Sequence, residues 1–332
     1  MALPPQLSGR LSLPVVASPM FIASGPELVI AQCQAGIVGS FPALNARPAS
    51  LLGDWLDRIV EENAAYAVAN PEAVVAPFAV NQIVHRSNDR LEQDMAVIVE
   101  HEVPIVISSL GARTEINDAV HSYGGIVLHD VINNEYARKA IEKGADGLIA
   151  VAAGAGGHAG TQSPFALIQE IRTWFDGPLL LSGSIAHGRS ILAAQAAGAD
   201  LAYIGSAFLS TAEANVVPGY RQMIVDSTAA DIVYSNLFTG VHGNYLRGSI
   251  VAAGLDPDNL PESDPSQMNF GSSGVDAKAW RDVWGAGQGI GAVTEAGSTA
   301  ELVATLRRQY EQACGDLATT VGNLTGAVVS AR

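Results

Sequence analysis

The sequence has few of the residues that build metal sites or disulfide frameworks. Its only two cysteines, Cys33 and Cys314, are far apart and form no CxxC pair, so neither a disulfide framework nor a zinc site is predicted. Its histidines do not show metal-ligand spacing such as HExxH. We therefore expect no metal.

Basic residues and long apolar runs are also scarce. The 18 Lys and Arg residues are outnumbered by 33 Asp and Glu, for a formal net charge of −15. Such a charge repels nucleic acid and anionic membrane surfaces. The first twenty residues lack a basic region followed by a long apolar run, so no signal peptide or membrane span is predicted. We expect a cytoplasmic protein without nucleic-acid or membrane partners, and a homodimer stays open.

Apolar residues and glycine are abundant. The hydrophobic fraction is 48% and the chain of 332 residues contains 34 glycines, which provides for a large core and many tight turns. The length suits a barrel of roughly 250 residues that carries an added lobe.

Eight short apolar runs alternate with amphipathic stretches in the first two-thirds of the chain. Near-continuous apolarity is typical of strands buried on both faces, as in a parallel sheet. The predicted strands are Leu13–Ala17, Gly36–Ser40, Pro77–Asn81, Pro104–Ser108, Gly125–His129, Gly147–Ala152, Pro178–Ser182 and Leu201–Gly205.

Helical patterns fill the intervals, for example 135–143 and 190–197, each followed by a glycine suited to a helix C-terminus (Gly144, Gly198). Together these elements predict an α/β fold, a closed (β/α)8 (TIM) barrel, over residues 1–214. A doubly wound open sheet is the alternative, but no GxGxxG follows the first strand.

The alternation stops after about residue 214. Residues 215–293 mix helical pieces with Pro-, Gly-, Asn- and Asp-rich loops, which predicts a smaller, mainly helical lobe covering the C-terminal face of the barrel and the substrate. Residues 294–332 are expected to form a C-terminal helix on the barrel. Its amphipathic pattern covers 296–313, and "STAE" (298–301) is typical of a capping box.

Two strand ends have the composition of a phosphate site. The seventh predicted strand leads into Gly183 and Ser184, and the eighth into Gly205 and Ser206. Glycine lets backbone N–H groups approach an anion, and the loops after strands seven and eight are the usual phosphate site of a TIM barrel. The sequence therefore predicts that a phosphate group binds there.

His158 lies in a glycine-rich run, "AVAAGAGGHAG" (150–160), after the sixth predicted strand. An imidazole titrates near neutral pH and suits proton transfer, so His158 is the candidate general acid or base. The alternative is a surface-loop histidine that binds nothing. His129, which ends the fifth strand, and His242, in the lobe, are candidates for the substrate site. A core role for His129 is an equal alternative.

Five motifs in order carry a family resemblance: "LPVVASPMF" (13–21), "PFAVNQ" (77–82), "GADGLIAVAAGAGGHAG" (144–160), "LLLSGSIAHGRSI" (179–191) and "GADLAYIGSAFLST" (198–211). With them the chain resembles the nitronate monooxygenase (2-nitropropane dioxygenase) family of FMN-dependent TIM barrels, which are related to the FMN-dependent enoyl-ACP reductases. The resemblance covers at least residues 13–214 and continues to "WGAGQGIG" (284–291).

The resemblance implies FMN as cofactor and His158 as the catalytic residue. Residues 17–20 would lie against the isoalloxazine ring, Asn81 near the ring or the ribityl chain, and the two glycine turns at the phosphate. The full implied cofactor set is Ala17, Ser18, Pro19, Met20, Asn81, Ala152, Gly157, Gly183, Ser184, Gly205, Ser206 and Gln288.

Three positions depart from the family pattern. Ser18 stands where many members have Gln, Ser184 replaces the commoner second Gly, and Ser206-Ala207 replaces a Thr-Arg pair. The last change removes a cation near the phosphate, so we expect weaker FMN binding than is usual in the family.

The implied activity is FMN-dependent oxidation of nitronates or nitroalkanes by O2 to a carbonyl compound and nitrite, with His158 as general base. Two alternatives stay open. One is an NAD(P)H-dependent FMN reductase of enoyl-thioester or quinone substrates, and the other is a catalytically silent flavin-binding barrel.

Overall fold

The computed structural model describes residues 3–263 and 282–330. Eight parallel strands pair in the order β1-β9-β8-β6-β5-β4-β3-β2, and a parallel bridge between Val16 and Val38 joins the two ends of this sheet. The predicted closed (β/α)8 barrel is confirmed. Its strands are β1 (Val15–Ala17), β2 (Gly39–Pro42), β3 (Phe78–Ile83), β4 (Ile105–Ser109), β5 (Ile126–Val131), β6 (Gly147–Val151), β8 (Leu179–Ser182) and β9 (Leu201–Ile204).

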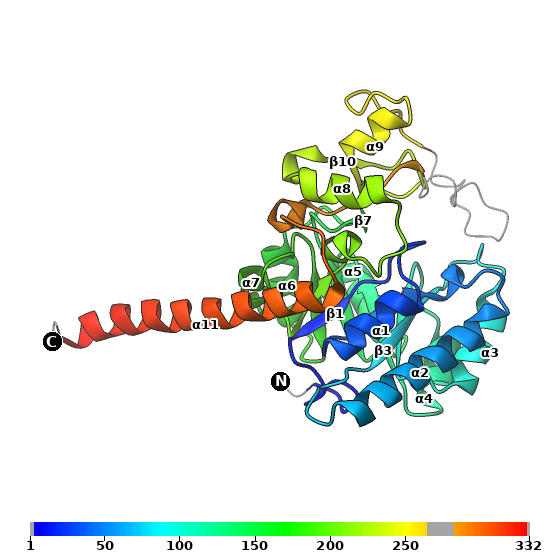
Figure 1. Ribbon diagram of the computed structural model, residues 1–332, viewed down its shortest axis with the longest axis horizontal. Helices are drawn as coiled ribbons and strands as arrows, with labels where there is room; N and C mark the ends of the chain where they lie inside the picture. The colour runs from blue at the N-terminus through cyan, green and yellow to red at the C-terminus, as the bar shows by residue number, and fades with distance from the viewer. Residues whose placement is uncertain (1–2, 264–281, 331–332) are drawn as a thin grey trace.

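Helices surround the barrel (Figure 1). They are α1 (Pro26–Gln34), α2 (Leu51–Ala69), α3 (Leu91–Glu100), α4 (Thr114–His121), α5 (Asn134–Glu142), α6 (Pro164–Arg172) and α7 (Gly188–Ala197), with short 3-10 turns η1 (Ala43–Asn45) and η2 (Ser206–Ser210). Gly144 and Gly198 follow α5 and α7 with φ of +97° and +115°, the left-handed conformation expected at these helix ends.

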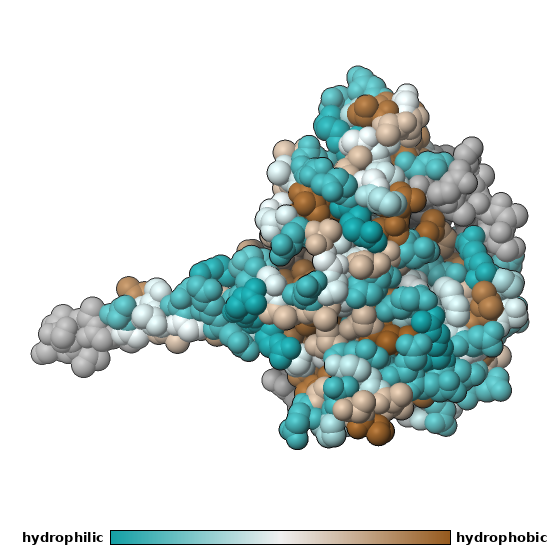
Figure 2. Space-filling view, in the orientation of Figure 1, coloured by the Kyte–Doolittle hydropathy of each residue, from teal (hydrophilic) through white to brown (hydrophobic). Residues whose placement is uncertain are grey.

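The strands are apolar on both faces because each face is buried. Inward-facing residues such as Val16, Ala79, Ile105, Ile149 and Leu180 fill the barrel interior in one cluster. The outward-facing side chains of the same strands pack under the helices in two larger clusters. On the outer face shown in Figure 2, hydrophilic residues predominate and apolar ones are scattered.

A lobe lies over one end of the barrel (Figure 1). Its described elements are α8 (Pro218–Asp226), η3 (Ala229–Asp231), β10 (Ile232–Ser235), β11 (Gly243–Leu246), α9 (Arg247–Ala252) and η5 (Gln288–Ala292). Residues 264–281 of the predicted lobe lie outside the described residues. The sequence predicts mainly helical pieces here, and the structure adds an antiparallel sheet of order β10-β11-β7.

The third strand of that sheet, β7 (Gly157–His158), belongs to the glycine-rich run after β6. The sequence predicts a flexible loop there. A strand of only two residues is too short to show an alternating pattern of apolar and polar residues. Its partner, β11, is more than eighty residues away, so nothing in the sequence indicates this pairing.

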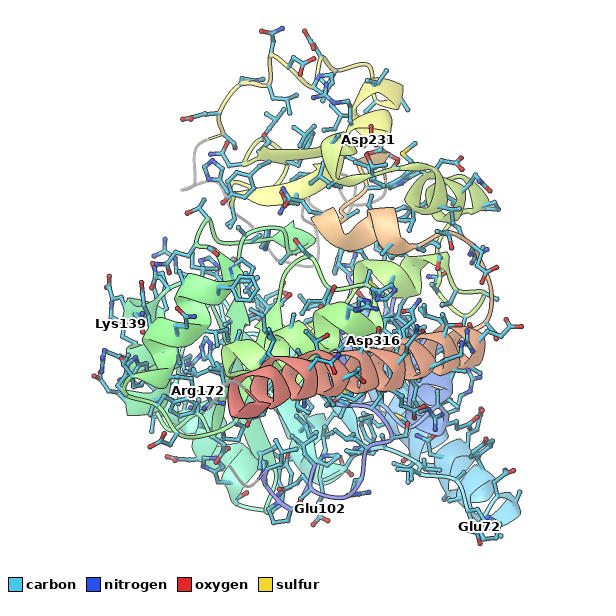
Figure 3. All side chains as sticks on the ribbon, turned by 90° about the vertical axis from the view of Figure 1, so that its left-hand side faces the viewer. Glu72, Glu102, Lys139, Arg172, Asp231 and Asp316 are labelled. Atoms are coloured by element: carbon cyan, nitrogen blue, oxygen red, sulfur yellow. The ribbon has the colours of Figure 1, made fainter. Side chains whose placement is uncertain are left out.

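The C-terminal helix α11 (Thr299–Ser330) is longer than its sequence pattern and extends away from the body (Figure 1). Its capping box is present, since the Ser298 and Glu301 backbone N–H groups each donate to the other residue's side chain. It crosses the outside of α7 (Figure 3), where the Tyr310 hydroxyl donates to Gln195 Oε1 at 2.5 Å. Within the described ranges, no helix combines the length and apolarity needed to span a membrane.

Candidate active site

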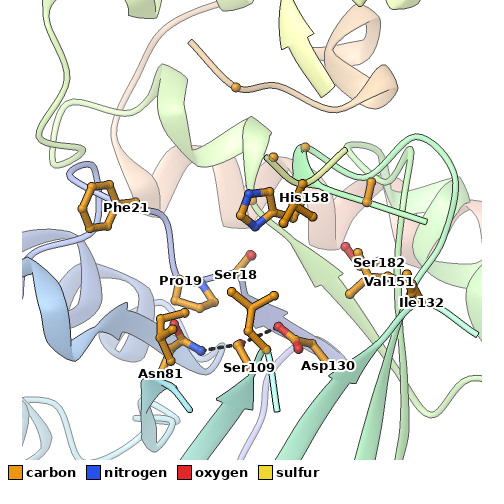
Figure 4. Close-up of a pocket in the computed structure, with 18 of the residues that line it drawn as sticks. Ser18, Pro19, Phe21, Asn81, Ser109, Asp130, Ile132, Val151, His158 and Ser182 are labelled. Carbon is orange, nitrogen blue, oxygen red and sulfur yellow. Dashed lines mark hydrogen bonds between the residues drawn. The ribbon is translucent and has the colours of Figure 1, made fainter. Parts of the chain in front are cut away.

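A cavity of about 1070 Å³ separates the C-terminal ends of the strands from the lobe. Drug-sized ligands occupy pockets of roughly 300–1,000 Å³, so this cavity has room for a cofactor together with a substrate. The predicted site residues that line it are Ser18, Pro19, Met20, Asn81, His129, Gly157, His158, Gly205, Ser206 and His242 (Figure 4).

A second, small cavity of about 20 Å³ adjoins the first, because Gly156, Ser182, Gly205 and Ser206 line both. The predicted phosphate residues Gly183, Ser184, Gly205 and Ser206 line it, together with Gly287 and Gly289. Gln288 lies beside it and donates its backbone N–H to Gly154 O at 2.9 Å. Ala17 and Ala152 are fully buried and line neither cavity.

The glycine turns of the small cavity fit a phosphate group by shape. Gly183 has φ of +136°, and a Cβ there would lie 2.8 Å from Ala153 O. Ser184 adopts φ of +57°, a conformation that glycine reaches at lower cost. The Ser206 hydroxyl accepts from Gly287 N at 2.8 Å, which ties this turn to the C-terminal segment. The described lining contains no Lys or Arg, so backbone amides and hydroxyls would hold the anion.

The segment from Ser18 to Ser24 is fixed by Asn45, which follows β2. The Asn45 side chain donates to Met20 O and Ser24 O and accepts from Ile22 N, at distances of 2.8 to 3.0 Å. The residues expected to contact the ring are thereby held in place by a side chain that the sequence did not single out.

His158 is held from two directions. Through its backbone it pairs with Gly243 of β11, and its Nε2 lies 2.9 Å from Thr239 Oγ1. The Thr239 hydroxyl is within 3.1 Å of Val241 O. If it donates there, Nε2 of His158 carries the hydrogen and Nδ1 holds the lone pair. Burial lowers the pKa of His158 to about 4, because desolvation disfavours the imidazolium.

The other two candidate histidines differ in environment. His129 is buried, and its two ring nitrogens each lie 2.8 Å from a carbonyl oxygen, of Asp130 and of Gly111. The exposed His242 is at the rim, where its ring stacks on Tyr234 at 5.0 Å between centroids. His129 thus belongs to the barrel framework at the cavity, and His242 to its entrance.

Ser109, Asp130 and Tyr203 are among the cavity residues that the sequence analysis did not single out. The predicted strands four and five stopped at Ser108 and His129, one residue before Ser109 and Asp130. Asn81 Nδ2 donates to Ser109 Oγ at 2.7 Å, and Ser109 Oγ donates to Asp130 Oδ2 at 2.5 Å (Figure 4). Burial raises the pKa of Asp130.

Comparison with known proteins agrees with this geometry. The family model described as nitronate monooxygenase matches residues 7–309, which is nearly the whole chain. The chain belongs to the nitronate monooxygenase family. As a member it is an FMN-dependent oxidoreductase with a TIM-barrel fold.

Individual relatives in this family are distant. A nitronate monooxygenase of Paraburkholderia phytofirmans is 26% identical over an alignment that covers 92% of this chain and 94% of the relative. A Mycobacterium tuberculosis protein named as a monooxygenase is 30% identical, but the match covers 62% of this chain and 54% of that protein. The chain thus matches about half the length of the second relative.

Solved structures of similar fold include a nitroalkane oxidase and FabK. The nitroalkane oxidase of Streptomyces ansochromogenes superposes with a TM-score of 0.76 at 23% identity, covering 93% of this chain and 98% of that one. A FabK variant from Thermotoga maritima gives the same score and identity over 93% and 96%. At these identities the likeness shows the TIM-barrel fold alone and does not choose between reactions.

Proposed function

We propose that this nitronate monooxygenase family member binds FMN in the cavity and oxidises a small nitronate or nitroalkane with O2, yielding a carbonyl compound and nitrite. The observation that carries the proposal is His158, a half-buried, neutral imidazole held at the cavity wall by β11 and Thr239. FMN, when bound, supplies the transfer of electrons from substrate to O2.

The residues present fit FMN. The glycine turns at Gly183 and Gly205 would take the phosphate, and the loop of Ser18, Pro19 and Met20 would support the ring. Asn81 lies on the barrel side of the same cavity. The lobe covers part of the cavity, and any water that it and a bound substrate displace would strengthen the electrostatic interactions inside.

His158 holds or moves one proton in this scheme. Its neutral imidazole would accept the α-proton of a nitroalkane, but a pKa of about 4 makes the imidazole a weak base. A bound anion would favour the imidazolium and so raise its basicity. We therefore expect the nitronate, which needs no deprotonation, to be the better substrate.

The decisive experiment is anaerobic mixing of the FMN-loaded protein with propyl-2-nitronate in one series and with NADH or NADPH in another, followed by flavin absorbance. We expect the nitronate to reduce the flavin rapidly and the nicotinamides to reduce it little. Aerobic mixing with the nitronate should release nitrite. Inertness toward every reductant would instead indicate a silent flavin-binding barrel.

The second candidate is an NAD(P)H-dependent reductase of an enoyl-thioester or quinone. Cavity size favours it, because about 1070 Å³ lies at the upper end of the usual range of ligand pockets, which suits a substrate larger than a small nitronate. Relatives named as carboxyl-CoA dehydrogenases, 24% identical over 72% of this chain, also act on thioesters by name. Complete bleaching of the flavin by a nicotinamide would move the protein to this class.

A further inference from the structure

The apolar face of α11 continues beyond the edge of the barrel. Where the helix lies on α7 and α1, Val303, Leu306 and Ala313 of this face are buried. Past Asp316 the same face leaves the barrel, and Leu317, Val321 and Leu324 are 47%, 48% and 66% exposed. Intervals of three and four residues place all its members on one side of the helix. The α11 stripe consists of Val303, Leu306, Tyr310, Ala313, Leu317, Val321 and Leu324.

The projecting half of α11 has a composition that propagates a helix poorly. Three glycines, three threonines and three valines are found among the sixteen residues 315–330, and these residue types disfavour an isolated helix. Most helical stability in proteins comes from packing of an apolar face. The helix nevertheless continues to Ser330, and no element of the described ranges lies beside its second half (Figure 1). A covering surface would supply the missing stabilisation.

The charge of this segment indicates the chemistry of that surface. Residues 317–330 contain no Asp, Glu, Lys, Arg or His, although the chain has a net charge of −15. The segment therefore offers no ion pair to a charged partner. A second copy of the α11 stripe does match it, because identical faces that meet across a twofold axis are self-complementary. Apolar residues three and four apart are also the spacing with which two helices interdigitate.

The position of the stripe leaves room for a second copy. Residues 317–330 extend over about 21 Å at 1.5 Å per residue, away from the body of the molecule (Figure 1). Two projecting halves can therefore lie side by side in opposite directions, with the two barrels at the ends of the helix pair. None of the described residues of α11 lines either cavity, so this pairing leaves the candidate active site open.

We propose that the α11 stripe beyond Asp316 is a dimerisation surface, and that its partner is the same stripe of a second copy of this chain. Leu317 and Leu324 would be buried in the contact between the two helices. The proposal is independent of the proposed function, since it involves neither FMN nor the cavity.

The test is sedimentation equilibrium of the full-length protein over a range of protein concentrations. We expect the wild type to change reversibly from one chain to two as the concentration rises. Leu324→Asp should raise the dissociation constant of the dimer at least about a hundredfold, because the twofold axis brings both carboxylates into one apolar contact, where like charges are costly. Far-UV circular dichroism should show less helix in this variant at concentrations where the wild type is a dimer.

Thr319→Asp is the matched control. Thr319 is also exposed, and it lies roughly 200° around the helix from Leu317, on the face away from the stripe. The same charge placed there should leave the dissociation constant and the helix content unchanged. Both variants should keep the near-UV circular dichroism of the wild type, which reports that the barrel is folded.

A wild type that stays a single chain at every concentration would overturn the proposal. So would a dimer that Leu324→Asp leaves intact, since the contact would then lie elsewhere, or a dimer that Thr319→Asp weakens equally. A single chain that floats with neutral lipid vesicles would make a lipid surface the partner instead. These measurements use neither flavin nor substrate, so their outcome leaves the proposed function untouched.

Discussion

His158 combines two properties at the scale of a single residue. Its ring is fixed by a hydrogen bond to Thr239, which would fix which nitrogen faces the substrate. Its desolvation keeps it neutral well below the pH at which an exposed histidine gains a proton. Orientation and charge state therefore both depend on the lobe that covers it.

Replacement of His158 by Asn should separate the two substrate forms. We expect kcat/KM for neutral 2-nitropropane to fall about 10²–10⁴-fold, the usual contribution of a general base, and kcat/KM for the nitronate to fall much less. The measurement is nitrite release at saturating O2. His187→Asn, at the N-terminus of α7 and outside both cavities, is the control and should retain most activity with both substrates. Equal, undiminished rates in His158→Asn would show that this histidine moves no proton.

The pH dependence of stability should also report His158. Its pKa is 6.5 when exposed and about 4 in the folded protein, so between these values the unfolded chain binds more protons. Its contribution to the free energy of unfolding therefore decreases as pH falls from 6.5 to 4, by about 2 kcal/mol on going from pH 7.5 to 5. Urea unfolding at both pH values should show this loss, and His158→Asn should reduce the difference. An equal pH dependence in the variant would place the His158 pKa near its ordinary value.

At the scale of elements, the pairing of β7 with β11 connects the barrel to its lobe. The Asn244 amide strengthens this contact by donating to Ala155 O at 2.6 Å, and the Tyr234 hydroxyl donates to Ala159 O at 2.9 Å. Backbone and side-chain hydrogen bonds on both sides of His158 thus make the glycine-rich run an ordered part of the site.

Gly243→Ala tests this connection. A Cβ on Gly243 would lie 2.7 Å from Gly157 O and 3.2 Å from His158 N, so the two strands must move apart. We expect kcat/KM to fall at least about tenfold, the cost of a small displacement of a catalytic group, while FMN content stays normal because the phosphate turns lie elsewhere. Gly219→Ala in α8, where a Cβ meets only Trp284 at 3.5 Å, is the control. Normal turnover in Gly243→Ala would mean that the β7–β11 contact does not position His158.

At the scale of the whole molecule, α11 is joined to the barrel by its first half. Gln309 Oε1 accepts from Gly188 N at 3.0 Å, and Arg189 pairs with Asp316 at 2.6 Å (Figure 3). Beyond Asp316, side chains such as Leu317 and Leu324 are 47% and 66% exposed. The first half therefore contributes the packing energy of this helix to the barrel.

Gly188→Ala should weaken this packing. Its Cβ would overlap the backbone of Gln309 and Tyr310, and overpacking of this kind costs about 1–3 kcal/mol. We expect a lower Tm by differential scanning calorimetry. Gly315→Ala in α11 is the matched control, because a Cβ there meets nothing within 4 Å and alanine favours a helix by about 1 kcal/mol. If Gly188→Ala melted no lower than the wild type, α11 would contribute little to the stability of the barrel.

The sequence by itself determined the barrel fold and the order of the turns that follow its strands. Strands buried on both faces need continuous apolar runs, and helix ends such as those at Gly144 and Gly198 favour glycine. Both features can therefore be recognised from short stretches of sequence. Gly183, Gly205 and His158 could be singled out in the same way, because each follows a predicted strand and cofactor sites in this fold lie just after the strands.

Only the tertiary structure decided what surrounds these residues. The β7–β11 pairing, the support of the Met20 loop by Asn45 and the chain that ends at Asp130 join segments that are distant in sequence. At the end of β5 the neighbouring residues His129 and Asp130 both line the cavity, which a pattern of alternating faces does not predict. The pKa shifts of His158 and Asp130 likewise follow from burial, which a linear pattern of residues does not contain.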